Sequence, residues 1–524
     1  MRDAPLILGV SGLRGIVGES LTPEVAVRYA GAFGSWLQEK IEHRSPLVLV
    51  ARDGRVGGES TYTAAISGLL ATGCRVRRLG IAMTPTAGMQ CDLVGADAAV
   101  IITASHNPQE WNGLKVIVRE KSWIDATTDC RGVVEDAESD ACAPNAASAE
   151  EIVSRYRAGQ ITWWSGQNCQ DSTVDDDVED PHCLRVLGAC ARALGVNDFW
   201  AWFEERLQPR VVVDSVNSSG SVMCRVMFEG SPCHLVSLYG EMTGIFPHTP
   251  EPTKENLSGA DGLCDAVPGL KADVGFAQDP DADRLAIVDE KGVYIGEEYT
   301  LVLCAMALME GRGAAGGTGA ARAEARGSQT PVFVVNLSTS RMIDDVAAHF
   351  GAEVVRTPVG EANVVEAMKR LKGAGRDVVM GGEGNGGVIW PEVTYVRDSL
   401  SAMALTLALM ARTGKTVSEL VAMIDAMGPG KKGYCILKRK APLASKADAV
   451  PVVEHVAGHY KGVAGAVVDT QDGVRIDWPE RGVWAHVRAS NTEPIMRVIV
   501  EAPTEGEAGA VASEVEGVIA GVRK

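Results

Sequence analysis

Short runs of apolar, mostly β-branched residues alternate with longer helical patterns along the whole chain. Examples of such runs are Leu47–Ala51, Ala98–Ile102, Val211–Asp214 and Val332–Val335. They lack the polar alternation of a half-solvated strand, so we expect strands that are covered by helices on both faces. A polar loop or a cluster of glycine, asparagine or serine follows each run. The pattern therefore predicts an α/β fold with binding sites at the carboxyl ends of its strands.

The composition narrows the class of protein. The chain has 524 residues and a formal net charge of −18, which disfavours general binding to nucleic acid or to an anionic membrane. No apolar run approaches the roughly 18–20 residues of a membrane span, and we find no signal-peptide pattern. The twelve cysteines include no Cys-x-x-Cys pair, so we expect reduced, mostly buried thiols and a cytoplasmic location.

Changes in composition suggest how the chain is divided. Residues 133–182, with the acidic run Asp175–Asp177, are predicted to be an exposed insertion, as is the Gly/Ala-rich stretch 311–328. A linker is expected at Gly428–Lys432, and a small α+β domain after it. The predicted domains are 1–182, 183–298, 299–427 and 428–524.

The first polar loop is Thr103–Pro108, directly after a predicted strand. Ser105 beside His106 suggests a hydrolase nucleophile, but the Gly-x-Ser-x-Gly elbow is absent. Adjacent side chains of an extended segment point apart, so His106 is not expected to face Ser105. An Asn-Pro turn without chemistry is the alternative. Lys115 follows closely and adds a cation.

The second loop carries three carboxylates at alternate positions, Asp279, Asp281 and Asp283. In an extended segment they would face the same way, and three like charges would need a cation. Oxygen-only ligands favour Mg²⁺ or Ca²⁺. An EF-hand is excluded because Arg284 stands where its glycine is required and a strand pattern follows. A solvated acidic turn is the alternative.

Two further loops offer polar groups suited to a phosphorylated polyol. Gly382–Gly387 matches Gly-x-Gly-x-x-Gly formally, but the β-like stretch after it argues against a dinucleotide site. Its carboxylate and amide, Glu383 and Asn385, suit sugar hydroxyls. Arg488–Pro494 offers a guanidinium, two hydroxyls and an amide, which together form a cup for a dianion. Simple structural turns are the alternative for both loops.

Taken together, the loops suggest phosphoryl transfer with a phosphorylated polyol, and they resemble the α-D-phosphohexomutase family. The resemblance covers essentially the whole chain in order. The segments that carry it are Val10–Gly15, Arg52-Asp53, Thr103–Pro108, Phe246–Pro252, Asp279–Arg284, Thr357–Gly360, Gly382–Gly387 and Arg488–Pro494. It implies three related α/β domains with mixed sheets and a C-terminal α+β domain like half of the TATA-box-binding protein, around a central cleft.

The resemblance also implies a role for each matching residue. Ser105 would be the phosphoserine, and its phosphate would bind Mg²⁺ together with Asp279, Asp281 and Asp283. Lys115, His106, Arg14 and Arg284 would line the catalytic cleft, with Lys115 as the candidate for proton transfer. Substrate would be held by Glu383, Asn385, Arg488, Ser490, Asn491 and Thr492.

The implied reaction interconverts hexose 6-phosphate and hexose 1-phosphate through a hexose 1,6-bisphosphate. The Ser11–Pro23 opening and the Glu383–Gly387 loop look most like the phosphoglucosamine mutase branch, and the phosphoglucomutase/phosphomannomutase branch is the alternative. Gly387 stands where the family often has histidine, and Ala282 where many members have glycine. We expect a monomer or homodimer.

Two other classes stay open from the sequence. One is a metal-dependent phosphatase that stops at the phosphoenzyme. The other is a non-catalytic protein that binds sugar phosphates, although the intact Ser105 and the three aspartates argue against it.

Overall fold

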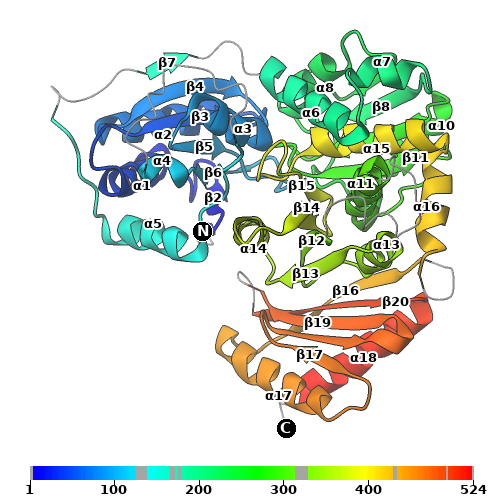
Figure 1. Ribbon diagram of the computed structural model, residues 1–524. Helices are drawn as coiled ribbons and strands as arrows, with labels where there is room; N and C mark the ends of the chain where they lie inside the picture. Colours follow the sequence, from blue (N-terminus) through cyan, green and yellow to red (C-terminus); the bar gives the residue numbers. More distant parts are fainter. Residues whose placement is uncertain are drawn as a thin grey trace. The chain divides into compact units, whose positions relative to one another are not determined.

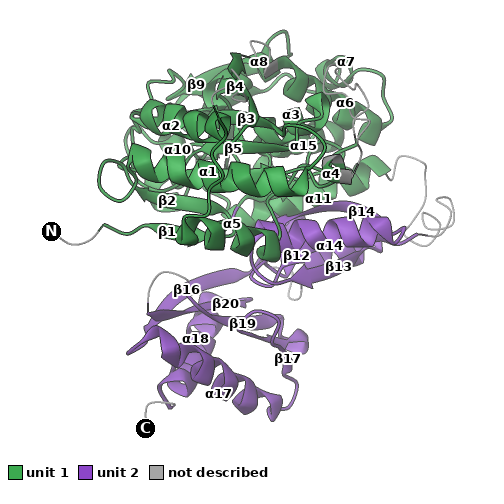
Figure 2. Ribbon diagram, turned by 90° about the vertical axis from the view of Figure 1, so that its left-hand side faces the viewer, with its two compact units in different colours: residues 1–314, 386–418 green, residues 315–385, 419–524 purple. Residues whose placement is uncertain are grey.

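The computed structural model describes residues 4–124, 138–165, 172–174, 179–312, 329–428, 433–490 and 494–521. The chain divides into two compact units, coloured separately in Figure 2. Unit 1 contains residues 1–314 and 386–418, and unit 2 contains residues 315–385 and 419–524.

Unit 1 begins with a mixed seven-stranded sheet in the order β1-β2-β6-β5-β3-β4-β7 (Figure 1). The central strands β3 and β5 are parallel, and β6 is antiparallel to both of its neighbours. Helices α1 and α2 pack on one face and α3 on the other, so the central strands are buried. The strands are β1 (Ile7–Gly9), β2 (Gly12–Ile16), β3 (Leu47–Arg52), β4 (Arg75–Ile81), β5 (Ala98–Ile102), β6 (Trp111–Val118) and β7 (Ser172–Val174), and the helices are α1 (Pro23–Lys40), α2 (Gly58–Ala71), α3 (Thr84–Val94), α4 (Lys121–Ile124) and α5 (Ala146–Ala158).

A second mixed sheet of unit 1 has the order β11-β10-β8-β9. β8 is parallel to both neighbours, whereas β10 and β11 are antiparallel and are joined by the aspartate loop. Its strands are β8 (Arg210–Asp214), β9 (His234–Leu238), β10 (Val274–Gln278) and β11 (Leu285–Asp289). The later segment of unit 1 contains the short strand β15 (Gly387–Ile389), which is not part of this sheet. The helices are α6 (Glu179–Leu194), α7 (Phe199–Glu204), α8 (Gly220–Phe228), α9 (Lys254–Leu257), α10 (Leu263–Gly269), α11 (Glu297–Arg312) and α15 (Ser399–Thr413).

Unit 2 contains parallel strands in the order β13-β12-β14 and a separate antiparallel sheet in the order β16-β20-β19-β18-β17. Helices α17 and α18 form a core with the antiparallel sheet. The strands are β12 (Pro331–Asn336), β13 (Glu353–Thr357), β14 (Asp377–Glu383), β16 (Cys435–Pro442), β17 (Val467–Asp469), β18 (Val474–Trp478), β19 (Val483–Ala489) and β20 (Ile495–Ala502). The helices are α13 (Met342–Phe350), α14 (Glu361–Gly373), α17 (Ala449–Lys461) and α18 (Glu505–Gly521), and α16 (Val417–Asp425) runs from unit 1 into unit 2.

The predicted fold class of three α/β parts and a C-terminal α+β part is confirmed. The exact domain boundaries stay predictions. Ten cysteines are described, and all ten are free thiols as expected. Among the described residues, none of the helices combines the length and the hydrophobicity needed to cross a bilayer.

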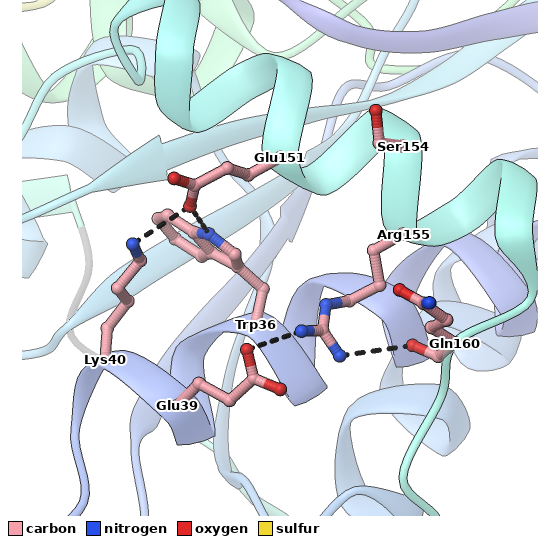
Figure 3. A pocket seen from close by; sticks show the side chains of 7 residues that line it. All are labelled: Trp36, Glu39, Lys40, Glu151, Ser154, Arg155 and Gln160. Atoms are coloured by element: carbon pink, nitrogen blue, oxygen red, sulfur yellow. Dashed lines mark hydrogen bonds and ion pairs between the residues drawn. The ribbon is translucent and has the colours of Figure 1, made fainter.

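The prediction that residues 133–182 form an exposed loop is wrong for its described middle part. Helix α5 lies there and packs against α1. Glu151 accepts hydrogen bonds from Trp36 Nε1 at 2.7 Å and pairs with Lys40 Nζ at 2.9 Å, while Arg155 pairs with Glu39 (Figure 3). These side chains line a pocket of about 380 Å³, but they satisfy one another, so the pocket is a helix contact rather than a ligand site.

Several predicted features fall outside the described residues. They are Asp175–Asp177, residues 313–328 of the Gly/Ala-rich stretch, and the expected linker apart from Gly428.

His486 of β19 connects the two sheets within unit 2. Its Nε2 bonds the Asp472 carbonyl oxygen at 2.7 Å, and its Nδ1 lies 2.8 Å from Ser338 Oγ, just after β12. A neutral imidazole satisfies both contacts, because Nε2 donates while Nδ1 accepts from the hydroxyl. Burial lowers the pKa of His486 to about 4, although the neighbouring Asp472 opposes that change; Arg475 and Arg488 add to it.

We therefore expect acid to destabilise unit 2. A histidine that titrates near 6.5 when unfolded and near 4 when folded binds more protons in the unfolded state between these values, so stability falls as pH falls from about 6.5 to about 4. The full loss from such a shift is about 3 kcal/mol. Urea midpoints at pH 7.5 and 5.0 should differ more for the wild type than for His486→Gln. Equal differences in the two proteins would contradict the assignment.

Candidate active site

The loop between β10 and β11 brings three carboxylates together. Asp279, Asp281 and Asp283 are fully buried, and one oxygen from each lies within 4.8 Å of the others. The predicted convergence is present, but the extended backbone expected for it is wrong. The loop turns instead, since Ala282 N bonds the Asp279 carbonyl oxygen at 2.9 Å and Ala282 has a φ of 54°. A positive φ favours glycine, so the alanine at this position adopts a backbone conformation that a side chain disfavours.

Two cations balance part of this negative charge. Lys115 Nζ, from β6, lies 3.2 Å from Asp281 Oδ2 and 2.6 Å from Asp283 Oδ2. Arg397 Nη2 lies 2.6 Å from the same Asp283 oxygen. Burial would raise the pKa of Asp283, but the charges of Arg397, Lys115 and Arg284 outweigh it and hold that pKa below its ordinary value. Asp283 is therefore a permanent anion.

Asp279 has a different environment from Asp283. Burial, together with the charges of Asp281 and Asp283, raises its pKa well above the ordinary range. Its Oδ1 accepts from Arg284 N at 3.1 Å, and its Oδ2 accepts from Ser105 Oγ at 2.7 Å. A cation at this point would relieve the repulsion and keep Asp279 ionised.

The aspartate cluster fits a hard divalent metal. Asp281 Oδ1 and Asp283 Oδ1 are buried and have no hydrogen-bond partner among the described residues. Buried carboxylate oxygens without partners are costly, and such groups are paired or coordinate metals. Because the donors are all oxygen, they match Mg²⁺ rather than Zn²⁺.

Ser105 lies at the edge of this cluster, on the loop after β5. Its φ is 51°, so the segment is not extended, and His106 Nδ1 lies 3.3 Å from Ser105 Oγ. The prediction that the two side chains point apart is therefore wrong, because the left-handed residue turns them toward the same side. The charge of Arg284, followed by burial and the charge of Arg14, lowers the pKa of His106 well below its ordinary value. His106 is thus a neutral neighbour of the hydroxyl.

The conformation of the Ser105 loop is held by residues to which the sequence analysis gave no role. Arg55 Nε pairs with Asp53 Oδ2 at 2.9 Å, and Arg55 Nη2 donates to the Ser105 carbonyl oxygen at 2.6 Å. Thr103 Oγ1 donates to Asp53 Oδ2 at 2.7 Å and accepts from Ser105 N at 2.9 Å. Asp53 and Arg55 follow β3 as Ser105 follows β5, and β3 pairs with β5. From the sequence, the expectation that these two strands are neighbours could have indicated that Asp53 and Arg55 lie near Ser105.

Of the remaining predicted residues in unit 1, Arg14 and Arg284 are near the same cluster. Arg14 Nη1 donates to Asn107 Oδ1 at 3.1 Å, and its pKa is lowered by burial, against the opposing charges of Asp281 and Asp283. Arg284 Nε lies 3.9 Å from Asp283 Oδ1. All eight predicted residues of unit 1 thus lie in one set. Arg397, which the sequence analysis missed, belongs to it as well. The predicted members are Arg14, Ser105, His106, Lys115, Asp279, Asp281, Asp283 and Arg284.

The predicted sugar and phosphate residues belong to unit 2. Glu383 Oε1 accepts from Asn336 Nδ2 at 2.9 Å and from Gly360 N at 3.1 Å. Asn385 Nδ2 lies 3.4 Å from Glu383 Oε2. Arg488 and Ser490 lie at the end of β19, where Arg488 Nε lies 3.2 Å from Asp472 Oδ2. Asn491 and Thr492 lie outside the described residues.

Comparison with known proteins identifies the family. Four descriptions match in order: phosphoglucomutase/phosphomannomutase alpha/beta/alpha domain I at residues 5–130, domain II at 196–292, domain III at 298–427, and the C-terminal domain at 435–518. The chain belongs to the phosphoglucomutase/phosphomannomutase family. It is therefore a phosphohexomutase, which is an isomerase.

Individual relatives carry two different names. A phosphoglucomutase/phosphomannomutase from Thermococcus kodakarensis is 34% identical over 96% of each chain. A probable phosphoglucosamine mutase from Methanopyrus kandleri is 31% identical over 95% of this chain and 94% of its own. The fold matches a family protein from Burkholderia thailandensis with a TM-score of 0.73 and 22% identity, over 99% of this chain and 98% of that one.

Thr103 offers a test of the Ser105 loop. Thr103→Val keeps the shape but removes the hydroxyl that links Asp53 to Ser105 N, and it leaves a buried N–H without its partner. We expect kcat to fall by about tenfold or more, because small displacements of a reacting group are costly. Thr103→Ser keeps the hydroxyl and should remain near the wild type. If the two variants have the same kcat, the hydroxyl does not position Ser105.

Proposed function

We propose that Ser105 carries a phosphoryl group and exchanges it with a hexose phosphate. The observation that carries this proposal is the placement of Ser105 Oγ, 2.7 Å from Asp279 in a buried cluster of three carboxylates. A hydroxyl beside a site for a divalent cation is the arrangement that phosphoryl transfer requires, because the transferring group is strongly anionic.

The proposed reaction has two transfers. In the first, a sugar hydroxyl oxygen forms a bond to the phosphorus of phospho-Ser105 as the Oγ–P bond breaks, and the hydroxyl proton passes to a base. The product is hexose 1,6-bisphosphate, which also serves as the activator that phosphorylates Ser105. In the second, Ser105 Oγ takes the phosphoryl group from the other position and that sugar oxygen regains a proton. The phosphate has then moved between C6 and C1.

Side chains of unit 1 would bind the metal and the phosphoryl group and would transfer the proton. Asp279, Asp281 and Asp283, with the Ser105 phosphate, would hold Mg²⁺, which when bound neutralises charge on the transferring group. Arg14 and Arg284 would bind phosphoryl oxygens. Lys115 stays our candidate for proton transfer. His106 is a second candidate because its neutral ring contacts Ser105 Oγ.

Side chains of unit 2 would orient the sugar phosphate. Glu383 accepts two hydrogen bonds through Oε1, which fixes the carboxylate for binding sugar hydroxyls. Asn385 would bind a further hydroxyl. Arg488 and Ser490, with Asn491 and Thr492, would bind the phosphate that is not being transferred.

We propose glucosamine 6-phosphate and glucosamine 1-phosphate as the preferred pair. The motifs of the Ser11–Pro23 opening and the Glu383–Gly387 loop favour this branch, as does the name of the Methanopyrus relative. Glucose and mannose phosphates are the second candidate, because the 34% identical Thermococcus relative carries the phosphoglucomutase/phosphomannomutase name.

A coupled assay across sugars tests this choice. We expect kcat/KM to be highest for glucosamine phosphate among the phosphates of glucosamine, N-acetylglucosamine, glucose and mannose. Ser105→Ala should fold and lose activity by orders of magnitude on all of them, because it lacks the oxygen that carries the phosphoryl group. A higher kcat/KM for glucose or mannose would select the second candidate. Phosphate release without isomerisation would indicate a phosphatase instead.

Removal of the metal is a separate test. Excess chelator should abolish activity, and added Mg²⁺ should restore it. Mg²⁺ should also raise the melting temperature of the wild type, because it binds the folded state, and this rise should be lost in Asp281→Asn. Full turnover in excess chelator, or the same Mg²⁺-dependent rise in the variant, would contradict the assigned site.

A further inference from the structure

The turn between β17 and β18 lies directly against the end of β19. Gly473 in this turn has a φ of 67°, and a Cβ atom there would lie 2.2 Å from the Val487 carbonyl oxygen and 2.9 Å from Arg488 Cα. Only glycine fits so close to another backbone at a positive φ. The close approach places the preceding residue, Asp472, beside the side chain of Arg488.

Asp472 makes three contacts through this placement. Its carbonyl oxygen accepts from His486 Nε2 at 2.7 Å, which fixes the turn to β19. Its carboxylate Oδ2 lies 3.2 Å from Arg488 Nε and accepts from Val359 N at 3.0 Å. One oxygen therefore contacts both the proposed phosphate-binding arginine and the loop 357–360.

The loop 357–360 also holds the proposed sugar-binding residue. Gly360 N donates to Glu383 Oε1 at 3.1 Å. Two adjacent amides, Val359 N and Gly360 N, thus bind the carboxylates of Asp472 and Glu383. The positions of Arg488 and Glu383 are coupled through one short stretch of backbone, within unit 2.

We propose that Asp472 is a positioning residue that sets the orientation of Arg488 for the phosphate of the substrate. The ion pair places the Asp472 carboxylate 3.2 Å from Nε without a hydrogen bond there, so the four N–H donors on the two Nη atoms remain for phosphate oxygens. It also fixes a long side chain before substrate binds, so less rotamer entropy is lost on binding. This inference rests on the proposed role of Arg488 in binding phosphate.

The Asp472 carboxylate could also weaken phosphate binding by repulsion, and the two effects predict opposite changes when the charge is removed. A carboxylate near a phosphate site repels a dianion, so its removal would tighten binding if repulsion dominated. Positioning predicts weaker binding when the charge is removed, and repulsion predicts stronger binding.

The test compares Asp472→Asn with the wild type. Asparagine keeps an oxygen that can accept from Val359 N, but it loses the charge that attracts Arg488. We expect KM for the sugar phosphate, and the inhibition constant of inorganic phosphate, to rise by about tenfold, because the opposite charge that holds the guanidinium in place is gone. We expect kcat to change little, and Asp472→Glu to recover part of the loss. A KM that is unchanged or lower in Asp472→Asn would overturn the proposal.

Two controls separate this inference from its premises. Asp469→Asn changes a carboxylate of the same hairpin that bonds only Gln471 among the described residues, and it should behave like the wild type. In an Arg488→Ala background, Asp472→Asn should add nothing to KM, since the residue it positions is gone. A further tenfold rise there would show that Asp472 acts through something else, and would overturn the proposal. If Arg488→Ala alone leaves KM unchanged, the premise that Arg488 binds phosphate fails instead.

Discussion

The buried charge of the aspartate loop is the constraint on which most of unit 1 depends. Three carboxylates removed from water repel one another, and burial makes each of them costly unless it is paired. Lys115 and Arg397 pair with Asp281 and Asp283, whereas no ion pair reaches Asp279 in the part of the chain that the structure describes. The uncompensated member is therefore the one that contacts Ser105. The uncompensated negative charge of the cluster therefore lies beside the Ser105 hydroxyl, where the proposed divalent cation and phosphoryl group would meet.

In unit 2, buried polar side chains hold the structure together through hydrogen bonds to backbone groups. Arg475 is buried, stacks on Trp484 with its guanidinium carbon 4.3 Å from the ring centroid, and donates to the Leu337 carbonyl oxygen. Glu501 accepts from Trp484 Nε1 at 2.8 Å and from Arg341 N at 2.9 Å. These bonds tie the segment after β12 to the antiparallel sheet, so the supports of Glu383 and of Arg488 form one connected piece.

The sequence predicted the fold class and the convergence of Asp279, Asp281 and Asp283, because strand–helix alternation and alternating carboxylates are local patterns. It failed where the backbone leaves regular geometry. The positive φ of Ser105 turns His106 toward the hydroxyl, and no local pattern in Thr103–Pro108 signals that value.

Contacts between residues that are distant in sequence could not be predicted either. Arg397 pairs with Asp283 from 114 residues away, and Arg55 reaches the Ser105 loop across 50 residues, so only tertiary structure shows either contact. Helix α5 was missed for a simpler reason. Its small residues give a weak apolar stripe, although Ile152 is buried in the core, and ion pairs and Trp36 add to the contacts that hold it on α1.

The division of unit 1 into two stretches of chain has a consequence for synthesis. A ribosome makes residues 1–314 first, then 315–385, which belong to unit 2, and only afterwards the segment 386–418 that completes unit 1. Proteins generally fold domain by domain from the N-terminus as they emerge. Arg397, which pairs with Asp283 of the aspartate loop, is translated only after about three quarters of the chain. The ion pairs of this loop therefore cannot be complete before that point. A nascent chain that stalls before this point carries Ser105 and all three aspartates without Arg397, one of the cations that pair with them.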